Sequence, residues 1–167
     1  ITPHGKTLFG ASHVDGAVKI DIATKAHKTV AVPEGVAVAG IVGLYFHEGS
    51  LVGIQNGTNP KRVIRAWLDP KMERVTKYAV LDEDHPMWDI PLTGTIVGDD
   101  LYYVGRSQLR AFDGPKIWPP EKLQDTIILK LPLVRASNGA TGREELLAVY
   151  VAMRAFDLQH GVVIRQR

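Results

Sequence analysis

The sequence predicts an all-β fold in which one strand unit recurs about three times. Residues 5–21 contain a glycine-polar turn, a strand around Leu8, a polar loop and an alternating run, a pattern typical of two β-strands around a loop. The same pattern returns around Leu51 and, less regularly, around Leu101. These leucines are 43 and 50 residues apart, the period typical of β-propeller blades. We therefore predict about three β-propeller blades, a partial propeller, followed by a C-terminal α-helix and a short terminal strand.

The strands are expected where apolar and polar residues alternate. The first unit offers three strands, the middle unit four and the last unit three, at residues 7–12, 17–22, 27–32, 41–48, 50–55, 62–68, 74–81, 94–98, 100–105 and 127–133. One sheet cannot bury both of its faces alone, so such units are expected to stack around an axis. A propeller usually has four or more blades, so a second chain or further sequence would have to complete the ring.

The residues after Leu133 follow a different pattern. Thr141 and Glu144 have the spacing of a capping box, and the run from 143 to 159 is rich in helix formers with apolar residues at helical spacing. The sequence thus predicts the only substantial helix within residues 142–159. We divide the chain into a partial propeller at 1–134 and a linker, helix and short tail at 135–167.

The closing run GVVIRQR permits two interpretations. Val162 to Ile164 either supplies an outer strand that the last unit lacks or pairs with another chain. The preferred alternative is a frayed tail or a non-native extension, because short C-terminal runs are often disordered.

Composition excludes several classes of protein. The chain has 167 residues, 45% of them hydrophobic and 23% charged, which is ordinary for one soluble globular domain. It has no long uninterrupted apolar span, and a net charge of +2 is too small to indicate nucleic-acid binding. Cysteine is absent, which excludes disulfides and thiolate metal sites. Because the chain begins at Ile1, we expect a processed or trimmed product, bacterial and periplasmic or secreted, although the compartment itself stays open.

Three runs carry a resemblance to a known family. They are LYFHEGSLVGIQNGTNPKRVIRAWLD at 44–69, HPMWDIPLTGTIVGDDLYYVGRSQ at 85–108 and WPPEKLQDTIILKLPL at 118–133. Together they resemble the C-terminal blades of six-bladed propellers in the senescence-marker-protein/gluconolactonase superfamily, over residues 1 to about 134. The resemblance implies a relation to divalent-metal-dependent lactonases or esterases.

A candidate ligand surface follows from the predicted topology. In such a fold the loops that enter each inner strand and the loops between the second and third strands open on the same face, where binding sites concentrate. Asn59 and Lys61 would also lie on this face. The predicted ligand-binding residues are His13, Asp15, Gln55, Asn56, Asp89, Thr93, Arg106, Ser107 and Gln108.

A metal site has weaker support in the sequence. Calcium needs several oxygen ligands aimed at one point. The resemblance implies an aspartate at each inner-strand start, but the matching positions hold Val42 and Thr93. Asn56 and Asp89 remain candidate calcium ligands, and the preferred alternative is that both are solvated loop residues. No cofactor is predicted with certainty, calcium being the candidate.

Three function classes stay open. We expect a propeller-type scaffold that binds a small molecule or a protein, related by resemblance to metal-dependent lactonases but weakly active or inactive alone. The alternative is a calcium-dependent lactonase or esterase once the ring is completed, with a metal-activated water as nucleophile. The third class is a structural fragment that assembles through its edges. The expected partner is a second copy, bound through open blade edges or the helix at 143–159, with no nucleic acid and no membrane.

Overall fold

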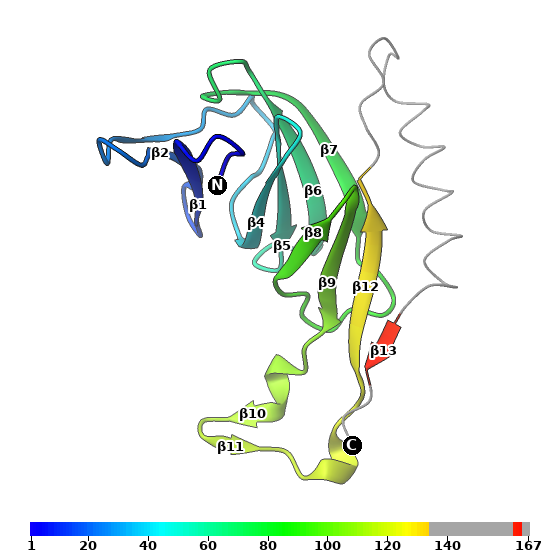
Figure 1. The fold of residues 1–167 in the computed structure, drawn as a ribbon. Coiled ribbons are helices and arrows are strands. Elements are labelled where there is room, and N and C mark those ends of the chain that lie inside the picture. The colour runs from blue at the N-terminus through cyan, green and yellow to red at the C-terminus, as the bar shows by residue number, and fades with distance from the viewer. Residues whose placement is uncertain (134–161, 165–167) are drawn as a thin grey trace. The chain divides into compact units, whose positions relative to one another are not determined.

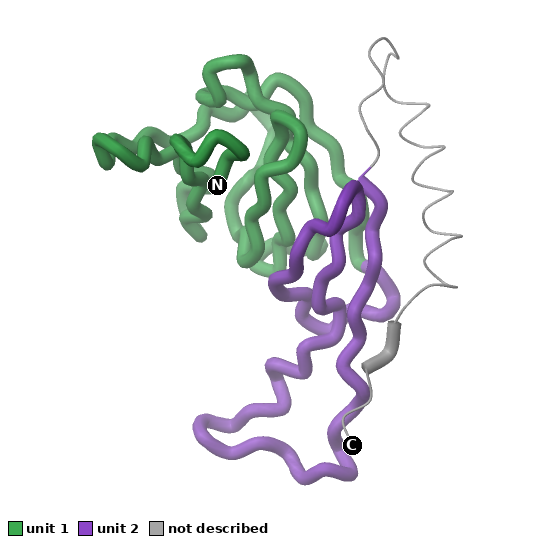
Figure 2. The backbone as a smooth tube through the Cα atoms, viewed as in Figure 1, with its two compact units in different colours: residues 1–84 green, residues 85–167 purple. Residues whose placement is uncertain are grey.

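The structure, a computed structural model, describes residues 1–133 and 162–164. The chain divides into two compact units, residues 1–84 and residues 85–167, which are described separately (Figure 2). The described residues form β-strands and two short 3₁₀-helices, and no α-helix occurs among them (Figure 1). No helix in this described part is long and apolar enough to cross a membrane.

The larger sheet of unit 1 has four antiparallel strands in chain order. They are β4 (Ile41–His47), β5 (Ser50–Gln55), β6 (Arg62–Leu68) and β7 (Val75–Glu83). All six residues of β5 are buried, as is typical of a central strand. Gly53 allows close packing there, because a Cβ at this position would lie 2.9 Å from Cδ1 of Ile41.

The smaller sheet of unit 1 contains β1 (Thr7–Ser12), β2 (Gly16–Asp21) and β3 (His27–Thr29) in the order β1-β2-β3. Its chain continues to Ala31, which bridges to Arg74 in parallel. The Ala31 N–H donates to the Glu73 carbonyl at 2.9 Å, and the Val75 N–H donates to the Ala31 carbonyl at 2.8 Å. Backbone pairing therefore ties this segment to the start of β7.

The core of unit 1 lies where these two sheets pack on one another. Phe9 of β1 stacks on Phe46 of β4, with ring centroids 5.7 Å apart and planes 2° from parallel. Offset-stacked aromatic pairs stabilise a core beyond the area they bury. The buried cluster comprises Phe9, Ala17, Val30, Val38, Ile41, Leu51, Ile64, Ala66 and Val75.

Unit 2 contains a four-stranded antiparallel sheet in the order β13-β12-β9-β8. Its strands are β8 (Gly94–Val97), β9 (Asp100–Arg106), β12 (Thr126–Pro132) and β13 (Val162–Ile164). Burial alternates along β9 and β12, so one face of each strand is covered. The Leu133 N–H extends the pairing by donating to the Asp99 carbonyl at 2.6 Å.

A long insertion separates β9 from β12. It contains η1 (Leu109–Ala111), β10 (Phe112–Asp113), β11 (Lys116–Ile117) and η2 (Pro120–Lys122). β10 and β11 pair only with each other, as a two-stranded antiparallel sheet with two residue pairs (Figure 1). We call residues 108–124 the insertion.

The predicted architecture of three propeller blades is wrong. The described residues form four antiparallel sheets, of three, two, four and four strands, and no closed propeller. Most strands lie close to their predicted positions, but β3 is only three residues long and the insertion adds a sheet of its own. A repeated turn and alternation specify neighbouring antiparallel strands, which many β architectures share, and do not specify how the sheets are arranged. The helix predicted within 142–159 lies outside the described residues.

The terminal strand agrees with one of the two predicted alternatives. β13 pairs antiparallel with β12, with Thr126 opposite Ile164 and Ile128 opposite Val162. The strand interpretation of these residues is therefore confirmed and the preferred frayed tail is wrong. β12 binds β9 along one edge, and its other edge offers the unpaired backbone groups that β13 takes up.

Candidate functional site

Part of the predicted ligand surface of unit 1 does come together. The His13 carbonyl accepts from the Gly40 N–H at 3.0 Å, and the Gly40 carbonyl accepts from the Gly57 N–H at 3.2 Å. A Cβ on Gly57 would lie 2.6 Å from Cε1 of His13, so the imidazole rests against this glycine, next to Asn56. The Asp15 carboxylate accepts from the Ser12 hydroxyl at 2.9 Å. His13 is thus adjacent to the 55–57 segment, while Asp15 is engaged within its own turn.

Gln55 has a structural role rather than a place on a ligand surface. Its side chain is fully buried, and its amide nitrogen donates to the carbonyl oxygens of Ala37 and Ala39, at 3.0 and 2.6 Å. The Tyr78 hydroxyl donates to the same Ala37 carbonyl at 3.4 Å, and burial raises the pKa of Tyr78 above its usual range. The amide of Gln55 therefore holds the loop that precedes β4.

Three predicted residues of unit 2 meet, but they bind one another. Oδ1 of Asp89 accepts from the backbone N–H groups of Ile90 and, at 2.9 Å, Ser107. Its Oδ2 accepts from the Gln108 N–H at 2.7 Å. The Ser107 hydroxyl donates to the Ile90 carbonyl at 2.8 Å. We call this arrangement the Asp89 brace; it uses the carboxylate to hold the end of β9.

The other two predicted residues of unit 2 are placed by the sheet. The Thr93 carbonyl accepts from the Val104 N–H at 3.2 Å, which continues the pairing beyond β8. Arg106 ends β9, where its backbone faces Ile127 of β12. Asn56 belongs to unit 1 and Asp89 to unit 2, so the calcium site that they were predicted to share stays a prediction. Within unit 2 the Asp89 brace already occupies both carboxylate oxygens.

A pocket in unit 1 lies away from the predicted surface. Its cavity has a volume of about 690 Å³, within the range of small-molecule sites. Phe46, Met72 and Pro3 provide apolar wall, while Thr2 and Thr7 bring hydroxyl groups. The remaining lining residues are His4, Lys6, His47, Glu48 and Gly49. The pocket thus combines apolar walls with several groups able to carry positive charge.

The N-terminal side of the pocket is built by a hydrogen-bonded turn. The Thr2 N–H donates to the Thr7 carbonyl at 2.9 Å, and the Gly5 N–H donates to the Thr2 carbonyl at the same distance. Thr2 is buried, and its hydroxyl pairs with the backbone of Thr7 at 3.3 Å. His4 and Lys6 are exposed within this turn, so their side chains border the pocket from a fixed backbone.

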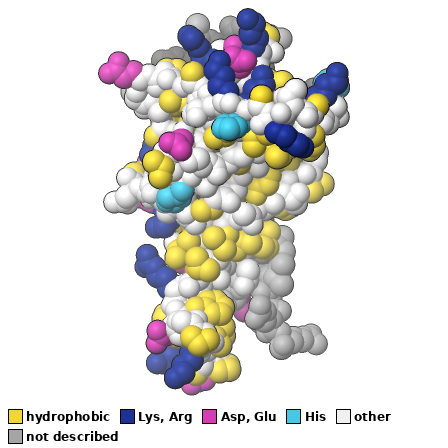
Figure 3. Space-filling view, turned by 90° about the vertical axis from the view of Figure 1, so that its left-hand side faces the viewer, with side chains coloured by type: hydrophobic (Ala, Val, Ile, Leu, Met, Phe, Trp, Pro, Cys, Tyr) yellow, Lys and Arg dark blue, Asp and Glu magenta, His cyan; other side chains and the backbone are white. Residues whose placement is uncertain are grey.

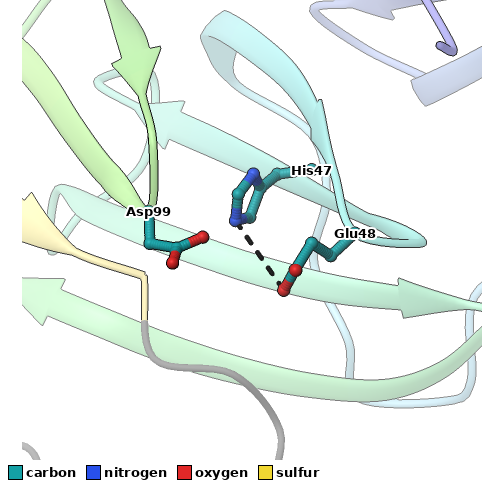
Figure 4. Close-up of side chains that lie close together, drawn as sticks. All are labelled: His47, Glu48 and Asp99. Carbon is teal, nitrogen blue, oxygen red and sulfur yellow. Dashed lines mark ion pairs between the residues drawn. The ribbon is translucent and has the colours of Figure 1, made fainter.

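The opposite side of the pocket is the turn between β4 and β5. Nε2 of His47 lies 3.9 Å from Oε2 of Glu48, the ion pair drawn dashed in Figure 4. The same Glu48 oxygen lies 4.0 Å from the Arg65 guanidinium, whose side chain is 1% exposed. Asp99, also labelled in Figure 4, belongs to unit 2, where its carbonyl accepts from the Leu133 N–H. The carboxylate of Glu48 is therefore balanced by a buried cation of its own unit.

Ser50 connects these charged groups to the backbone. Its hydroxyl donates to the His47 carbonyl at 2.5 Å and accepts from Nε of Arg65 at 2.8 Å. Arg65 also lies over the ring of Trp67, 5.0 Å from the centroid. A hydroxyl that both donates to a carbonyl and accepts from a guanidinium positions the turn and is not aligned with a base. Ser50 beside His47 is therefore a structural pair, not a nucleophile and its base.

Sequence reasoning missed the pocket because it placed binding at the other ends of the strands. Residues 47–50 read HEGS, a polar turn directly after the apolar run of β4, and this was the one local signal. Lys6 and Met72 have no sequence signal at all, since they reach the pocket only through the packing of the two sheets of unit 1.

Comparison with known proteins identifies no family. No family model matches the chain, and no curated protein matches it. Among solved structures, a chain of the Saccharomyces cerevisiae complex of Dbp5 with Nup159, Gle1, IP6 and ADP is similar, with 15% identity and a TM-score of 0.41. The similarity covers 75% of this chain and 31% of that chain, so the present chain spans about a third of it.

Proposed function

We propose that the chain is a binding scaffold whose ligand site is the pocket of unit 1, and that the ligand is a small organic anion with an apolar body. The observation that carries the proposal is the composition of this pocket. Phe46 and Met72 offer apolar surface, while Lys6 and His4 on one side and His47 on the other offer cationic or hydrogen-bonding groups.

The apolar part of the site favours a hydrocarbon or aromatic body. Phe46 is fixed by its stack on Phe9, so its ring is held in place before any ligand arrives. A preorganised wall reduces the entropy that binding must overcome. Burying the body of a ligand against Phe46, Met72 and Pro3 stabilises the complex in proportion to the apolar area removed from water, by roughly 25 cal/mol per Å².

The charged part of the site favours an anion. Glu48 is the one acidic lining residue, and Arg65 and His47 lie at 4.0 and 3.9 Å from its carboxylate. Lys6 is exposed at the pocket and adds a cation. Glu48 forms ion pairs with His47 and Arg65, and Lys6 is not among its ion-pair partners. A carboxylate or phosphate group on the ligand would therefore meet net positive charge.

Hydrolysis receives no comparable support from the described residues. The hydroxyl beside the pocket, that of Ser50, is held by Arg65 and by the His47 carbonyl. The positions where the family resemblance implies metal-binding aspartates hold Val42 and Thr93. We therefore propose binding without turnover and keep the calcium-dependent lactonase as the alternative that the same experiment tests.

Titration calorimetry with sodium octanoate at pH 7 tests the proposal. We expect saturable binding with a submillimolar dissociation constant, and weaker binding of 1-octanol, which lacks the charge, and of gluconate, which lacks the apolar body. Lys6→Glu should weaken octanoate binding at least about tenfold, because it replaces an attractive charge by a repulsive one. Lys25→Glu is the matched control, since Lys25 is exposed in the same unit but does not line the pocket.

Two results would contradict the proposal. The first is no octanoate binding at millimolar concentration. The second is equal weakening by both lysine variants, which would indicate a general charge effect. Hydrolysis of glucono-δ-lactone that calcium chloride stimulates would instead favour the lactonase.

A further inference from the structure

The insertion of unit 2 exposes four large hydrophobic side chains within ten residues. Leu109 is 51% exposed, Phe112 55%, Ile117 54% and Trp118 44%. Figure 3 shows hydrophobic and charged side chains together at the lower end of the view, over the β10–β11 hairpin. Single exposed hydrophobic residues are ordinary, but a concentration of aliphatic and aromatic ones is typical of an interaction surface.

The insertion is held in a defined conformation at its base. The Gln124 N–H donates to Oε1 of Gln108 at 2.5 Å, and Nε2 of Gln108 donates to the Gln124 carbonyl. The Asp89 brace fixes the residues just before this clamp, and the Trp118 N–H donates to the Ala111 carbonyl at 2.8 Å. The exposed side chains therefore project from a closed loop, so binding does not have to order a free segment.

The same surface carries charges of both signs. Arg110, Lys116 and Lys122 are exposed on the insertion, as are Asp113 and Glu121. Asp113 and Lys116 are opposite each other in the β10–β11 register. No ion pair within 4.0 Å joins any of these five residues to another residue in the described part of the chain. Because all five are exposed, their charges can contact a partner.

We propose that this face of the insertion is the interface through which two copies of the chain associate about a two-fold axis. In a two-fold interface the same patch meets itself, so it must contain both members of each attractive pair. Three basic and two acidic residues around four hydrophobic ones meet that requirement. An anionic membrane fits less well, because Asp113 and Glu121 would be repelled by its surface.

The residue types of the proposed interface are those common in contact surfaces between proteins. Trp118 and Phe112 provide the large aromatic side chains that dominate binding energy, and Arg110 belongs to the same enriched class. The open edges of β10 and β11 add backbone groups able to pair with those of a second copy. This surface is distinct from the helix at 143–159, and it does not depend on the pocket of unit 1.

Sedimentation velocity of the full chain from 1 to 200 μM tests the proposal. We expect a monomer–dimer equilibrium, and an increase of at least about thirtyfold in the dimer dissociation constant for Phe112→Asp/Trp118→Asp, since each change places a charge in a desolvated contact. Val14→Asp is the matched control, because Val14 is 81% exposed in the turn between β1 and β2. It should dimerise like the parent chain.

Variants in which the patch carries charges of mainly one sign test the two-fold pairing, and they do not require knowledge of which residues contact each other. Arg110→Glu/Lys116→Glu makes the patch acidic, and Asp113→Lys/Glu121→Lys makes it basic. We expect each variant alone to stay monomeric through self-repulsion, and an equimolar mixture to form heterodimers.

The proposal is overturned by any of three results. These are a monomeric parent chain at 200 μM, a dimer that tolerates Phe112→Asp/Trp118→Asp, and acidic and basic variants that fail to pair when mixed. A monomeric chain that cosediments with vesicles of phosphatidylserine and phosphatidylcholine, with a blue shift of tryptophan emission that Trp118→Phe removes, would assign the surface to anionic lipid instead.

Discussion

The carboxylate of Asp89 accepts a hydrogen bond from the backbone N–H of Gln108, 2.7 Å away and 19 residues later in the chain. Gln108 has left-handed backbone angles, with φ 55° and ψ 32°, directly before η1. A side chain in this conformation is unfavourable unless its surroundings hold it. The Asp89 carboxylate supplies that support, so a residue in the segment that leads into β8 fixes the start of the insertion.

Asp89→Asn should destabilise unit 2 by about 1–2 kcal/mol. The asparagine amide keeps one acceptor oxygen, but its NH₂ group replaces the other. The backbone N–H of either Ser107 or Gln108 then loses its acceptor. Thermal unfolding measures the loss, and amide exchange at Ser107 and Gln108 should accelerate. Glu34→Gln, at an exposed position outside the brace and the insertion, should change neither measurement. Unaltered exchange in Asp89→Asn would contradict the brace.

Gly94→Ala should disrupt the pairing of β8 with β9. A Cβ at this position would lie 2.6 Å from Cα of Tyr103 and would also clash with the Tyr102 carbonyl oxygen. Relieving contacts to backbone atoms requires the strands to separate, with an expected cost above about 2 kcal/mol. Gly10→Ala is the control, because its nearest neighbour, Cδ1 of Ile20, would be 3.9 Å away. Chemical denaturation that ranks the two variants equally would refute the close approach.

Ser50→Ala should destabilise unit 1 by about 1–3 kcal/mol. The change removes the acceptor for Nε of the buried Arg65 and the donor to the His47 carbonyl. Urea unfolding measures the cost. Thr76→Ala, which removes an exposed hydroxyl bond to the Trp67 carbonyl at 3.2 Å, should cost less than about 0.5 kcal/mol. Hydrolytic activity that Ser50→Ala abolishes without loss of stability would show that Ser50 is a nucleophile after all.

Glu73→Gln should flatten the dependence of stability on pH below 4.5. The ammonium of Lys28 donates to the Glu73 carboxylate at 2.7 Å and holds its pKa below the ordinary value of 4.5. A lowered folded-state pKa stabilises the fold above the unfolded value, and this contribution is lost as pH falls through the folded value. Urea unfolding between pH 3 and pH 7 measures the slope.

The pH experiment has a control variant, and part of the pH dependence should remain in Glu73→Gln. Glu34→Gln, at an exposed position, should leave the slope unchanged. The Asp69 carboxylate accepts from the backbone N–H groups of Glu73 and Arg74, and these bonds, chiefly the one from Glu73, lower the pKa of Asp69. Both N–H groups remain in Glu73→Gln, so some dependence of stability on pH should survive in this variant. An unchanged slope in Glu73→Gln would show that the Lys28 contact does not persist in solution.

Local alternation was enough to locate most strands but not the sheets. Strands β9 and β12 lie close to predicted runs because their burial alternates with the side of the sheet that each residue faces. Their assembly into four sheets depends on contacts between distant segments, such as Ala31 with Arg74. Neither residue carries a sequence signal for that contact, and the spacing of the repeated units does not predict it.

The predicted site residues show the same limit. Polar residues at strand ends were predicted to bind a ligand together, and in unit 2 the Asp89 carboxylate does meet the backbone of Ser107 and Gln108. Polarity alone does not reveal whether such groups face a ligand or satisfy backbone amides, and here they satisfy amides. The pocket residues Phe46 and Lys6 were not identified, because an apolar strand residue and a surface lysine are ordinary in isolation.

The sequence by itself determined where the chain turns, which residues alternate into strands and that the described part is β-rich, since these follow from neighbouring residues and short-range sterics. Tertiary structure decided the number of sheets, the capture of β13 by the free edge of β12 and the meeting of residues 2–7 with the β4–β5 turn. The physical reason is that strand edges and apolar faces are non-specific until a partner segment covers them, and that partner is chosen by packing over the whole unit.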